Sequence, residues 1–413
     1  MQSETADFKL QVVDSLVDLI RERGPLTVAA FMEFALYDER FGYYAREPQR
    51  SGRAGDFFTS VDVGALFGRL LAVQIAEMAD CLGADTATAP SMANGVSRQT
   101  WDLVEAGSGN GRLSADILRA LRVDHADSYE RVQLHLVESS SSARAQQIQT
   151  LGGSAGRLAS SSVKLPASYE GVLFANELLD AFPVHQVVMR GDGLREIYVD
   201  AHAGSLLTRE GPPSTPALED YLARLEIALE PGWRVEISLA AVEWMREASR
   251  RLRRGFIILI DYGHPAGELY SVTHAGGTLT SFSRHTMAGP EMAGNQPPWL
   301  AHPGEQDITA HVDFTSVRTA AEAEGLVMLA FLDQTYFLLG LCGANPVDPA
   351  NPTNPLHSVN RVNFVNHLNL EDRLALKTLL LPGGLGSTMK VMILGKGVGT
   401  PALQGASYRM RVT

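Results

Sequence analysis

The stretch LVEAGSGNGRLSADIL, residues 103 to 118, constrains the fold more than any other part of the chain. A short apolar run leads into glycines at alternate positions, Gly107, Gly109 and Gly111, and a helical pattern follows them. Glycine permits a sharp backbone turn and the close approach of a ligand, because it has no Cβ. The stretch therefore predicts a strand, a tight turn and a helix whose N-terminal N–H groups face whatever lies over the turn.

Further strand-like runs alternate with helical patterns along the chain. The runs are LVEA at 103, QLHLVE at 133, GVLFANE at 171, HQVVMR at 185, WRVEIS at 233, FIILIDYG at 256, VMLAFL at 327 and MKVMILG at 389. Helical patterns cover 113–122, 139–151, 217–228, 239–254 and 315–324. This alternation predicts an α/β fold with a doubly wound, mostly parallel sheet.

Composition and charge exclude several classes of protein. The 413 residues carry a net charge of −12, which disfavours nucleic acid as a partner because phosphate binding draws on clustered Lys and Arg. The only two cysteines, Cys81 and Cys342, lie in unrelated contexts, so neither a disulfide framework nor a cysteine zinc site is expected. No window is apolar over the length of a membrane span, and the N-terminus has no leader pattern. We therefore expect a cytoplasmic protein without a membrane span.

The spacing of the glycines and two carboxylates point to the class of ligand. Glu105 precedes the turn in an E-x-G-x-G-x-G pattern, whereas the dinucleotide fingerprint is G-x-G-x-x-G, which argues against an NAD-dependent oxidoreductase. Glu138 ends the next strand, at the sheet edge where an open α/β fold binds its ligand, and its carboxylate can accept both hydroxyls of a ribose. Together they predict S-adenosylmethionine (SAM) as cofactor. The alternative is an ordinary β-α-β crossover with a solvated glutamate.

Nine segments in one order carry a family resemblance that covers about residues 10 to 397. They are ALYDERFGYY (35–44), GRAGDFFTS (52–60), LVEAGSGNGRLSADILRAL (103–121), LHLVESS (134–140), ANELLDAFPVHQ (175–186), IDYGH (260–264), HPGEQDITAHVDF (302–314), QTYFLLGL (334–341) and PGGLGSTMKVMILGKG (382–397). The chain resembles the SAM-dependent methyltransferase family that includes bacterial MidA-like proteins and a mitochondrial complex I assembly factor that methylates an arginine of a complex I subunit. Ser108, where relatives commonly have proline, and the polar segment 83–100 depart from the family pattern.

The resemblance implies a Rossmann-like class I methyltransferase domain at 101–397, with insertions at about 205–235 and 265–314. A helical N-terminal part, 1–82, is expected to pack on the cofactor cleft, and 398–413 form a tail. Because no mitochondrial presequence is visible, the resemblance favours a bacterial cytoplasmic member. The implied cofactor-binding residues are Glu105, Gly107, Ser108, Gly109, Gly111, Glu138 and Asn176.

The candidate catalytic residues follow a strand that ends near the cofactor. Asn176 offers a donor and an acceptor, to an acceptor nitrogen or to the amino group of SAM. Glu177 and Asp180 would share a face of a helix that starts there, where two carboxylates could hold a guanidinium in fork geometry. The alternative is that Asp180 caps a helix or turn before Pro183 and that Glu177 points to solvent.

Three further segments contribute candidates. In GDFFTS, Ser60 is a plausible N-cap of a helix starting near residue 63, and the resemblance places this loop over the methionine end of the cofactor. The other segments, IDYGH and HPGEQDITAHVDF, are expected on the substrate side. The acidic and histidine residues of HPGEQDITAHVDF lack an H-x-x-x-H spacing, so no metal site is expected there. The candidates from these segments are Asp56, Thr59, Ser60, Asp261, Tyr262, Glu305, Asp307 and His311.

Three functions stay open at this point. The leading hypothesis is methylation of a protein arginine, in a subunit like those of complex I, by in-line transfer from SAM. A small-molecule O- or N-methyltransferase is the alternative within the class, and a non-catalytic assembly or binding factor is the alternative outside it. The acceptor protein or small molecule is the expected partner, and a homodimer is left open.

Overall fold

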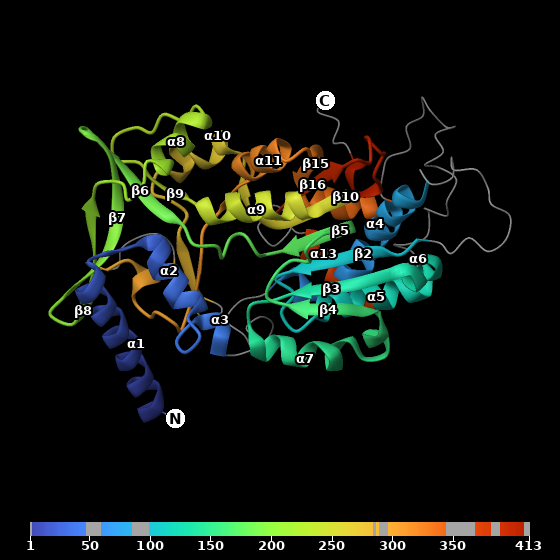
Figure 1. Cartoon of the computed structure of the whole chain (residues 1–413), viewed down its shortest axis with the longest axis horizontal. Coiled ribbons are helices and arrows are strands. Elements are labelled where there is room, and N and C mark those ends of the chain that lie inside the picture. The colour runs from blue at the N-terminus through green and yellow to red at the C-terminus, as the bar shows by residue number, and fades with distance from the viewer. Residues whose placement is uncertain are drawn as a thin grey trace.

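The fold is given by a computed structural model that describes residues 2–46, 59–84, 99–283, 286–288, 296–343, 368–380 and 389–408. Asp56 of the expected cofactor loop lies outside these residues. Figure 1 shows two regions of strands, a large sheet with helices on both sides and a smaller sheet beside the N-terminal helices. In the described part of the chain, no helix combines the length and the apolar content that a membrane crossing requires.

The large sheet has the strand order β15-β16-β10-β5-β2-β3-β4, and β14 pairs with the end of β10. Strands β10, β5, β2, β3 and β4 are parallel, and β16 runs antiparallel to β10 and β15. The bounds are β2 (Trp101–Ala106), β3 (Val132–Val137), β4 (Leu158–Ser162), β5 (Tyr169–Asn176), β10 (Leu252–His264), β14 (Val312–Asp313), β15 (Val327–Asp333) and β16 (Met389–Lys396). The doubly wound, mostly parallel α/β fold predicted from the sequence is confirmed.

The order of the strands reverses between β2 and β5. From β2 the chain adds β3 and β4 on one side, and afterwards β5 and β10 on the other. Open α/β sheets bind ligands outside the carboxyl ends of the strands at such a switch point. The ends of β2, β3, β5 and β10 are therefore where a cofactor and its reaction partner are expected to meet.

Helices cover both faces of the large sheet because successive strand residues point to opposite sides. Leu103 of β2 belongs to the core on one face and Val104 to the core on the other. The first face packs against α4 (Ala65–Ala84), α5 (Arg112–Asp124), α12 (Gln334–Leu341) and α13 (Leu370–Leu380), and the second against α8 (Ala217–Arg224), α9 (Leu239–Arg251) and α11 (Phe314–Ala323). Connecting elements are α6 (Ala126–Arg131), α7 (Ser141–Leu151), η3 (Gly152–Arg157) and η9 (Gln404–Ala406).

A second, antiparallel sheet is formed by four strands that lie between β5 and α9 in the sequence and by one strand near the N-terminus. It comprises β6 (His185–Arg190), β7 (Gly193–His202), β8 (Ser205–Gly211), β9 (Arg234–Ile237) and β1 (Leu26–Thr27). The runs at 185 and 233 are strands as predicted, but they belong to this sheet, and β7 and β8 had not been predicted. The sheet begins before the insertion bound expected near residue 205, and the domain bounds stay a prediction.

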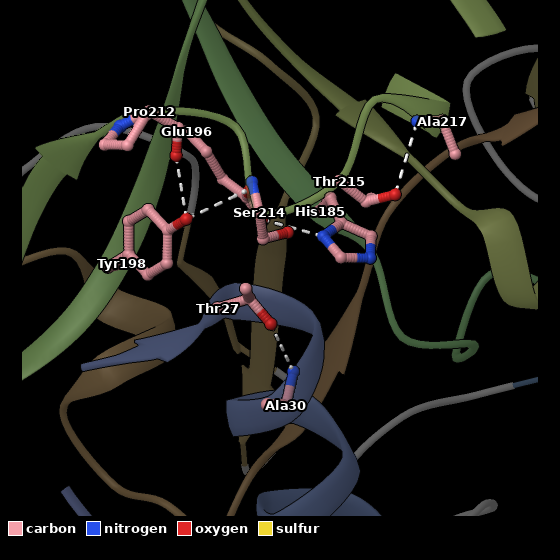
Figure 2. A network of polar contacts seen from close by, with 9 residues as sticks. All are labelled: Thr27, Ala30, His185, Glu196, Tyr198, Pro212, Ser214, Thr215 and Ala217. Carbon is pink, nitrogen blue, oxygen red and sulfur yellow. Dashed lines mark hydrogen bonds and ion pairs between the residues drawn. The ribbon is translucent and has the colours of Figure 1, made fainter. Parts of the chain in front are cut away.

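The first two helices of the chain pack on the second sheet rather than on the large one. A separate core joins α1 (Gln2–Arg23) and α2 (Val28–Tyr37) to β6 and β7, with Phe31 against Trp299 at a centroid distance of 5.6 Å. Figure 2 shows the polar network inside this unit, where Nδ1 of His185 lies 2.7 Å from Oε1 of the fully buried Glu196. A buried carboxylate destabilises the fold unless hydrogen bonds or a charged partner satisfy it. Glu196 of β7 is satisfied by His185 of β6 and by the backbone N–H of Ser214, so it connects β6, β7 and the segment after β8.

The remaining elements belong to the segment between β10 and β14 and to the connection between α2 and α4. Three short strands pair in the order β12-β11-β13. The bounds are α3 (Tyr43–Arg46), η1 (Ser60–Val63), α10 (Ala266–Leu269), η4 (Val272–His274), β11 (Thr280–Ser283), β12 (Thr286–Ala288), η5 (Pro298–Leu300) and β13 (Asp307–Thr309).

Candidate active site

The glycine turn after β2 has the backbone that its sequence predicts. Gly107, Gly109 and Gly111 have φ of 71°, 51° and 83°, all in the left-handed region that favours glycine. The backbone N–H of Gly107 donates to the carbonyl of Val137 on β3 at 2.9 Å. A Cβ on Gly107 would come within 2.9 Å of Leu178, whereas a Cβ on Gly109 would meet nothing within 4 Å. Gly109 therefore borders open space where a ligand can approach the backbone.

Glu138 lies beside this open position. Its Oε2 accepts the backbone N–H of Gly109 at 2.8 Å, and its Oε1 accepts that of Ser140 at 2.7 Å. A carboxylate offers about four lone-pair sites, so Glu138 keeps capacity for ligand hydroxyls. Gln147 of α7 donates to the carbonyl of Gly109 at 2.8 Å and to Oγ of Ser108 at 3.0 Å, a supporting contact that the sequence did not reveal.

Glu105 lies beneath the turn instead of facing the open side. It is 4% exposed, and Oγ of Ser114 on α5 donates to its Oε2. Burial raises the pKa of Glu105 to about 8. In the described structure this residue therefore joins β2 to the first turns of α5, and its predicted role as a cofactor ligand stays a prediction.

Asn176 and Glu177 come at the end of β5, next to the switch point. The Nδ2 of Asn176 donates to Oε1 of Glu177 at 3.0 Å, and the backbone N–H of Ser60 donates to the same oxygen at 3.4 Å. The Oδ1 of Asn176 is buried and has no hydrogen-bond partner among the described residues. An unsatisfied buried acceptor of this kind favours a donor on a bound ligand.

Glu177 has a backbone conformation that is uncommon for a residue with a side chain. Its φ is 50°, and its backbone N–H donates to the carbonyl of Ile260 on β10 at 2.8 Å. Burial is the main cause that raises its pKa to about 8, and Asp261 and Asp62 raise it further. Such backbone strain often accompanies functional sites, and the Glu177 side chain here is half-buried, with its Oε1 held by Asn176 and Ser60.

The segment after Glu177 corrects one expectation from the sequence. No helix starts there, so Glu177 and Asp180 do not share a helical face. A turn forms instead because Oδ2 of Asp261 accepts the backbone N–H groups of Leu178 at 3.1 Å and Leu179 at 2.7 Å. The side chain at the end of β10 thus shapes the turn at the end of β5, and Asp180 is buried within this turn rather than at the start of a helix.

Four carboxyl groups gather at this edge of the sheet. Burial raises the pKa of Asp180 well above its usual value, and the neighbouring carboxyls of Asp261, Asp307 and Glu177 raise it further. The pKa of Asp261 rises to about 7 through burial, against the hydrogen bonds that it accepts from the turn. We refer to Glu177, Asp180, Asp261 and Asp307 as the carboxyl cluster. Asp180, Asp261 and Asp307 are buried and Glu177 is half-buried, so the ionised forms of these groups are costly unless a cation pairs with them.

Three tyrosines border the carboxyl cluster. The hydroxyl of Tyr44 donates to Oδ1 of Asp307 at 2.7 Å, and that of Tyr37 donates to the carbonyl of Ala181 at 2.9 Å. The rings of Tyr37 and Tyr44 stack with a centroid distance of 5.5 Å. Burial and the cluster also raise the pKa of Tyr262, so it stays a neutral phenol. Only Tyr262 had been singled out from the sequence.

The loop before α4 reaches the same place through η1. Thr59, and not Ser60 as expected, is the N-cap: it and Asp62 form a capping box, with the Thr59 hydroxyl donating to Asp62 at 2.8 Å. Ser60 is fully buried and its hydroxyl donates to Oε1 of Gln334 at 3.3 Å. Arg112 at the start of α5 binds Asp62 at 3.0 Å, which connects this loop to the glycine turn.

Two substrate-side candidates lie away from the carboxyl cluster. Glu305 pairs with Lys9 of α1 at 3.2 Å, and His311 packs against His264 and His274. His311 also lines a pocket with Tyr221, but that pocket includes none of the glycines or the carboxyl cluster. The structure therefore brings together Asp261, Tyr262 and Asp307 from the substrate-side set, and not these two residues.

Comparison with known proteins identifies the family. Residues 70–332 match a family described as "Putative S-adenosyl-L-methionine-dependent methyltransferase". The chain belongs to this family. As a family member it is a SAM-dependent methyltransferase, and the cofactor predicted from the glycine turn is confirmed.

Individual relatives agree with the assignment. The chain is 26% identical over 358 residues to the Caenorhabditis elegans protein arginine methyltransferase NDUFAF7 homolog, covering 79% of this chain and 75% of that protein. It is 29% identical over 347 residues to the mitochondrial protein arginine methyltransferase NDUFAF7 of Rattus norvegicus, covering 77% and 71%. A crystal structure from Burkholderia thailandensis bound to S-adenosyl-homocysteine aligns with a TM-score of 0.79 at 28% identity, covering 98% of this chain and 96% of that one.

The residues of this methyltransferase fit the chemistry of its cofactor. The open position at Gly109 admits a ligand to the backbone, and the unpartnered Oδ1 of Asn176 matches an ammonium donor. Glu138 has spare acceptor capacity for hydroxyls. When bound, SAM supplies a methyl group on a sulfonium, which is the electrophile of the reaction.

Proposed function

We propose that this methyltransferase transfers the methyl group to a nitrogen of an arginine side chain on a protein. The observation that carries the proposal is the carboxyl cluster next to the expected position of the methyl group. A small neutral acceptor has no use for a cluster of three buried carboxyl groups and a half-buried one, whose ionisation is costly without a cation. A guanidinium pairs with carboxylates in bidentate geometry and matches this demand.

The roles of the residues follow from their contacts. Glu177 and Asp180 hold the guanidinium, and pairing with a carboxylate localises its charge on two nitrogens so that the third regains lone-pair character. Methyl transfer breaks a carbon–sulfur bond and forms a carbon–nitrogen bond, and the nitrogen then loses one proton. Glu177, whose pKa of about 8 lies near neutrality, is suited to accept that proton. Asn176 positions the cofactor's amino end, and Asp261 positions the turn that carries Glu177.

The aromatic side chains fit the same acceptor. Tyr37 and Tyr44 present stacked rings beside Asp307, and a guanidinium stacks favourably on aromatic faces. Relatives named protein arginine methyltransferases at 26% and 29% identity support the substrate class. A complex I subunit-like acceptor, a cytoplasmic location and a homodimer stay predictions.

The test is a methyl-transfer assay with purified enzyme, SAM and two peptide libraries that differ only in arginine against lysine. Formation of S-adenosyl-homocysteine and a peptide mass increase of one methyl group are followed together. Arginine peptides are expected to be methylated and lysine peptides not. If SAM binds but only small-molecule extracts consume it, the small-molecule methyltransferase is correct. If SAM binds and no acceptor of either kind consumes it, the assembly factor is correct.

A pair of variants links the activity to the site. Glu177→Gln is expected to keep SAM binding and to lose activity on the arginine peptide. Glu219→Gln, which removes an exposed carboxylate on α8, is the matched control and should retain both. Full activity of Glu177→Gln would remove this residue from the proposed mechanism.

A further inference from the structure

Three histidines that are distant in the sequence meet outside the carboxyl cluster. His264 ends β10, His274 ends η4, and His311 immediately precedes β14. Their ring centroids lie 4.7 Å (264 to 274), 5.3 Å (264 to 311) and 5.9 Å (274 to 311) apart. One ring nitrogen from each lies within 4.8 Å of those of the other two. We refer to these residues as the histidine cluster.

The contacts of the histidine cluster leave nitrogens free to face its centre. Nδ1 of His274 lies 3.1 Å from the backbone carbonyl of Glu268. Nδ1 of His264 lies 2.9 Å from the Glu268 carboxylate, in an electrostatic contact without hydrogen-bond angles. Histidine ligands of metals typically use one nitrogen for the metal and direct the other to a carbonyl or carboxylate. Glu268 supplies both kinds of oxygen to two of the three rings.

His311 provides the third position and an unexplained polar atom. Its Nδ1 is buried and has no hydrogen-bond partner among the described residues. Buried polar atoms are nearly always satisfied, so an unpartnered imidazole nitrogen beside two other imidazoles indicates a missing partner.

We propose that His264, His274 and His311 bind a divalent zinc-type ion, with Glu268 positioning the first two rings. Imidazole ligands suit Zn²⁺ and its first-row neighbours, whereas Mg²⁺ and Ca²⁺ prefer oxygen. In a tetrahedral zinc site with bonds of about 2.0–2.1 Å, ligand nitrogens are about 3.3 Å apart. The ring nitrogens lie within 4.8 Å of one another, so binding requires the side chains to rotate until the nitrogens approach to that value. The sequence expectation of no metal rested on 302–314 alone, which contributes one of the three histidines.

The position of the ion suggests what it does. The three ligands come from the end of β10, from the helical turn η4 and from the start of β14, and β10 and β14 pair at 263–264 with 312–313. An ion there cross-links the substrate-side insertion to the large sheet. The nearby cation Lys390 is paired with Asp333, which limits its repulsion of a metal. The proposal is independent of the methyl acceptor, because no residue of the histidine cluster belongs to the carboxyl cluster.

The experiment uses the full chain after removal of metals with a chelator. Zn²⁺ binding is measured by calorimetry and by elemental analysis after gel filtration, and Co²⁺ is added as an absorbing probe of tetrahedral geometry. One Zn²⁺ per chain, a Co²⁺ visible band displaced by Zn²⁺, and a higher melting temperature with Zn²⁺ are expected. No stoichiometric Zn²⁺ at millimolar concentration would overturn the proposal.

Variants assign the ligands with readouts that do not require activity. His274→Gln changes a residue in a short exposed turn and should fold, and it is expected to weaken Zn²⁺ binding at least tenfold and to remove the Co²⁺ band. Glu268→Gln is expected to weaken binding about 10–100-fold while keeping the band. The matched control is His202→Gln, an exposed histidine of β7, which should bind like the wild type. Wild-type Zn²⁺ affinity in folded His274→Gln would overturn the proposal.

Discussion

Asp261 at the end of β10 accepts the backbone N–H of Leu179, in the turn after β5, at 2.7 Å. The same oxygen accepts the N–H of Leu178, and the other oxygen accepts that of Tyr262 at 2.8 Å. One carboxylate therefore satisfies three backbone donors from two neighbouring strand ends. The turn that carries Glu177 and Asp180 depends on a residue more than eighty positions further along the chain.

Asp261→Asn should disturb both stability and activity. The amide can supply only one oxygen, so at least one buried N–H loses its acceptor, at a cost of about 1–3 kcal/mol in the free energy of unfolding. Because the turn then no longer holds Glu177, kcat should fall more than SAM affinity. Denaturant unfolding and SAM calorimetry measure the two effects. Asp200→Asn is the control, since Asp200 also accepts a backbone N–H, from Ala201 at 2.8 Å, but on β7.

Glu177 should give the methyl-transfer reaction a characteristic pH dependence. Burial raises its pKa to about 8, so the carboxylate that holds the guanidinium and accepts its proton forms only as the pH rises through that value. The kcat/KM of the wild type, which reports groups of the free enzyme, should increase up to about pH 8 and then level off. Glu177→Gln should lower kcat/KM by about 10²–10⁴-fold and remove this inflection. An unchanged inflection in the variant would assign it to another group.

The sequence predicted those parts of the candidate site whose residues directly follow or precede the strand that positions them. The glycine turn is readable because the glycines and the carboxylates Glu105 and Glu138 lie directly beside strands that are themselves continuous apolar runs. The same holds for Asn176 and Glu177 at the end of β5. In each case the residue that matters is within a few positions of the element that places it.

Contacts between residues that are far apart in the sequence could not be predicted in this way. Tyr44 of α3 and Asp307 of β13 are 263 positions apart, and they meet because α2, which precedes α3, packs against β13. The strands β6 and β9 have the composition of any half-buried strand, and only the pairing of β6 with β7 on one side and with β9 on the other shows that they belong to a second sheet. The histidine cluster also spans three segments whose spacing follows no metal-binding pattern. Pairing and tertiary packing, not residue type, determine these features.

Glu105 should make the folded state less stable at high pH. The pKa of its carboxyl is about 8 in the folded protein against an ordinary value of 4.5, so folding favours the protonated form. Its contribution to stability is complete below about pH 4.5 and is lost as the pH rises through 8, by about 1.4 kcal/mol per unit of pKa difference. Glu105→Gln keeps an acceptor for Ser114 without the charge. The difference in unfolding free energy between variant and wild type should therefore grow in favour of the variant from pH 5 to pH 9.

Gly109→Val should weaken SAM binding mainly because the new side chain excludes the cofactor, and only to a small extent because it strains the backbone. The valine side chain meets no protein atom near its Cβ, so its steric effect falls on the cofactor, while a φ of 51° strains the backbone by about 1 kcal/mol or more. SAM affinity measured by calorimetry should fall at least about 100-fold, a loss of roughly 2.7 kcal/mol.

Gly204→Val is the control for that loss, because Gly204 has a φ of 77° and equally open surroundings in the turn between β7 and β8. It should show the same order of strain in unfolding experiments and bind SAM like the wild type. If both variants lose the cofactor together, general destabilisation explains the effect. If neither loses it, the glycine turn does not border the bound cofactor and the assignment of Gly109 is wrong.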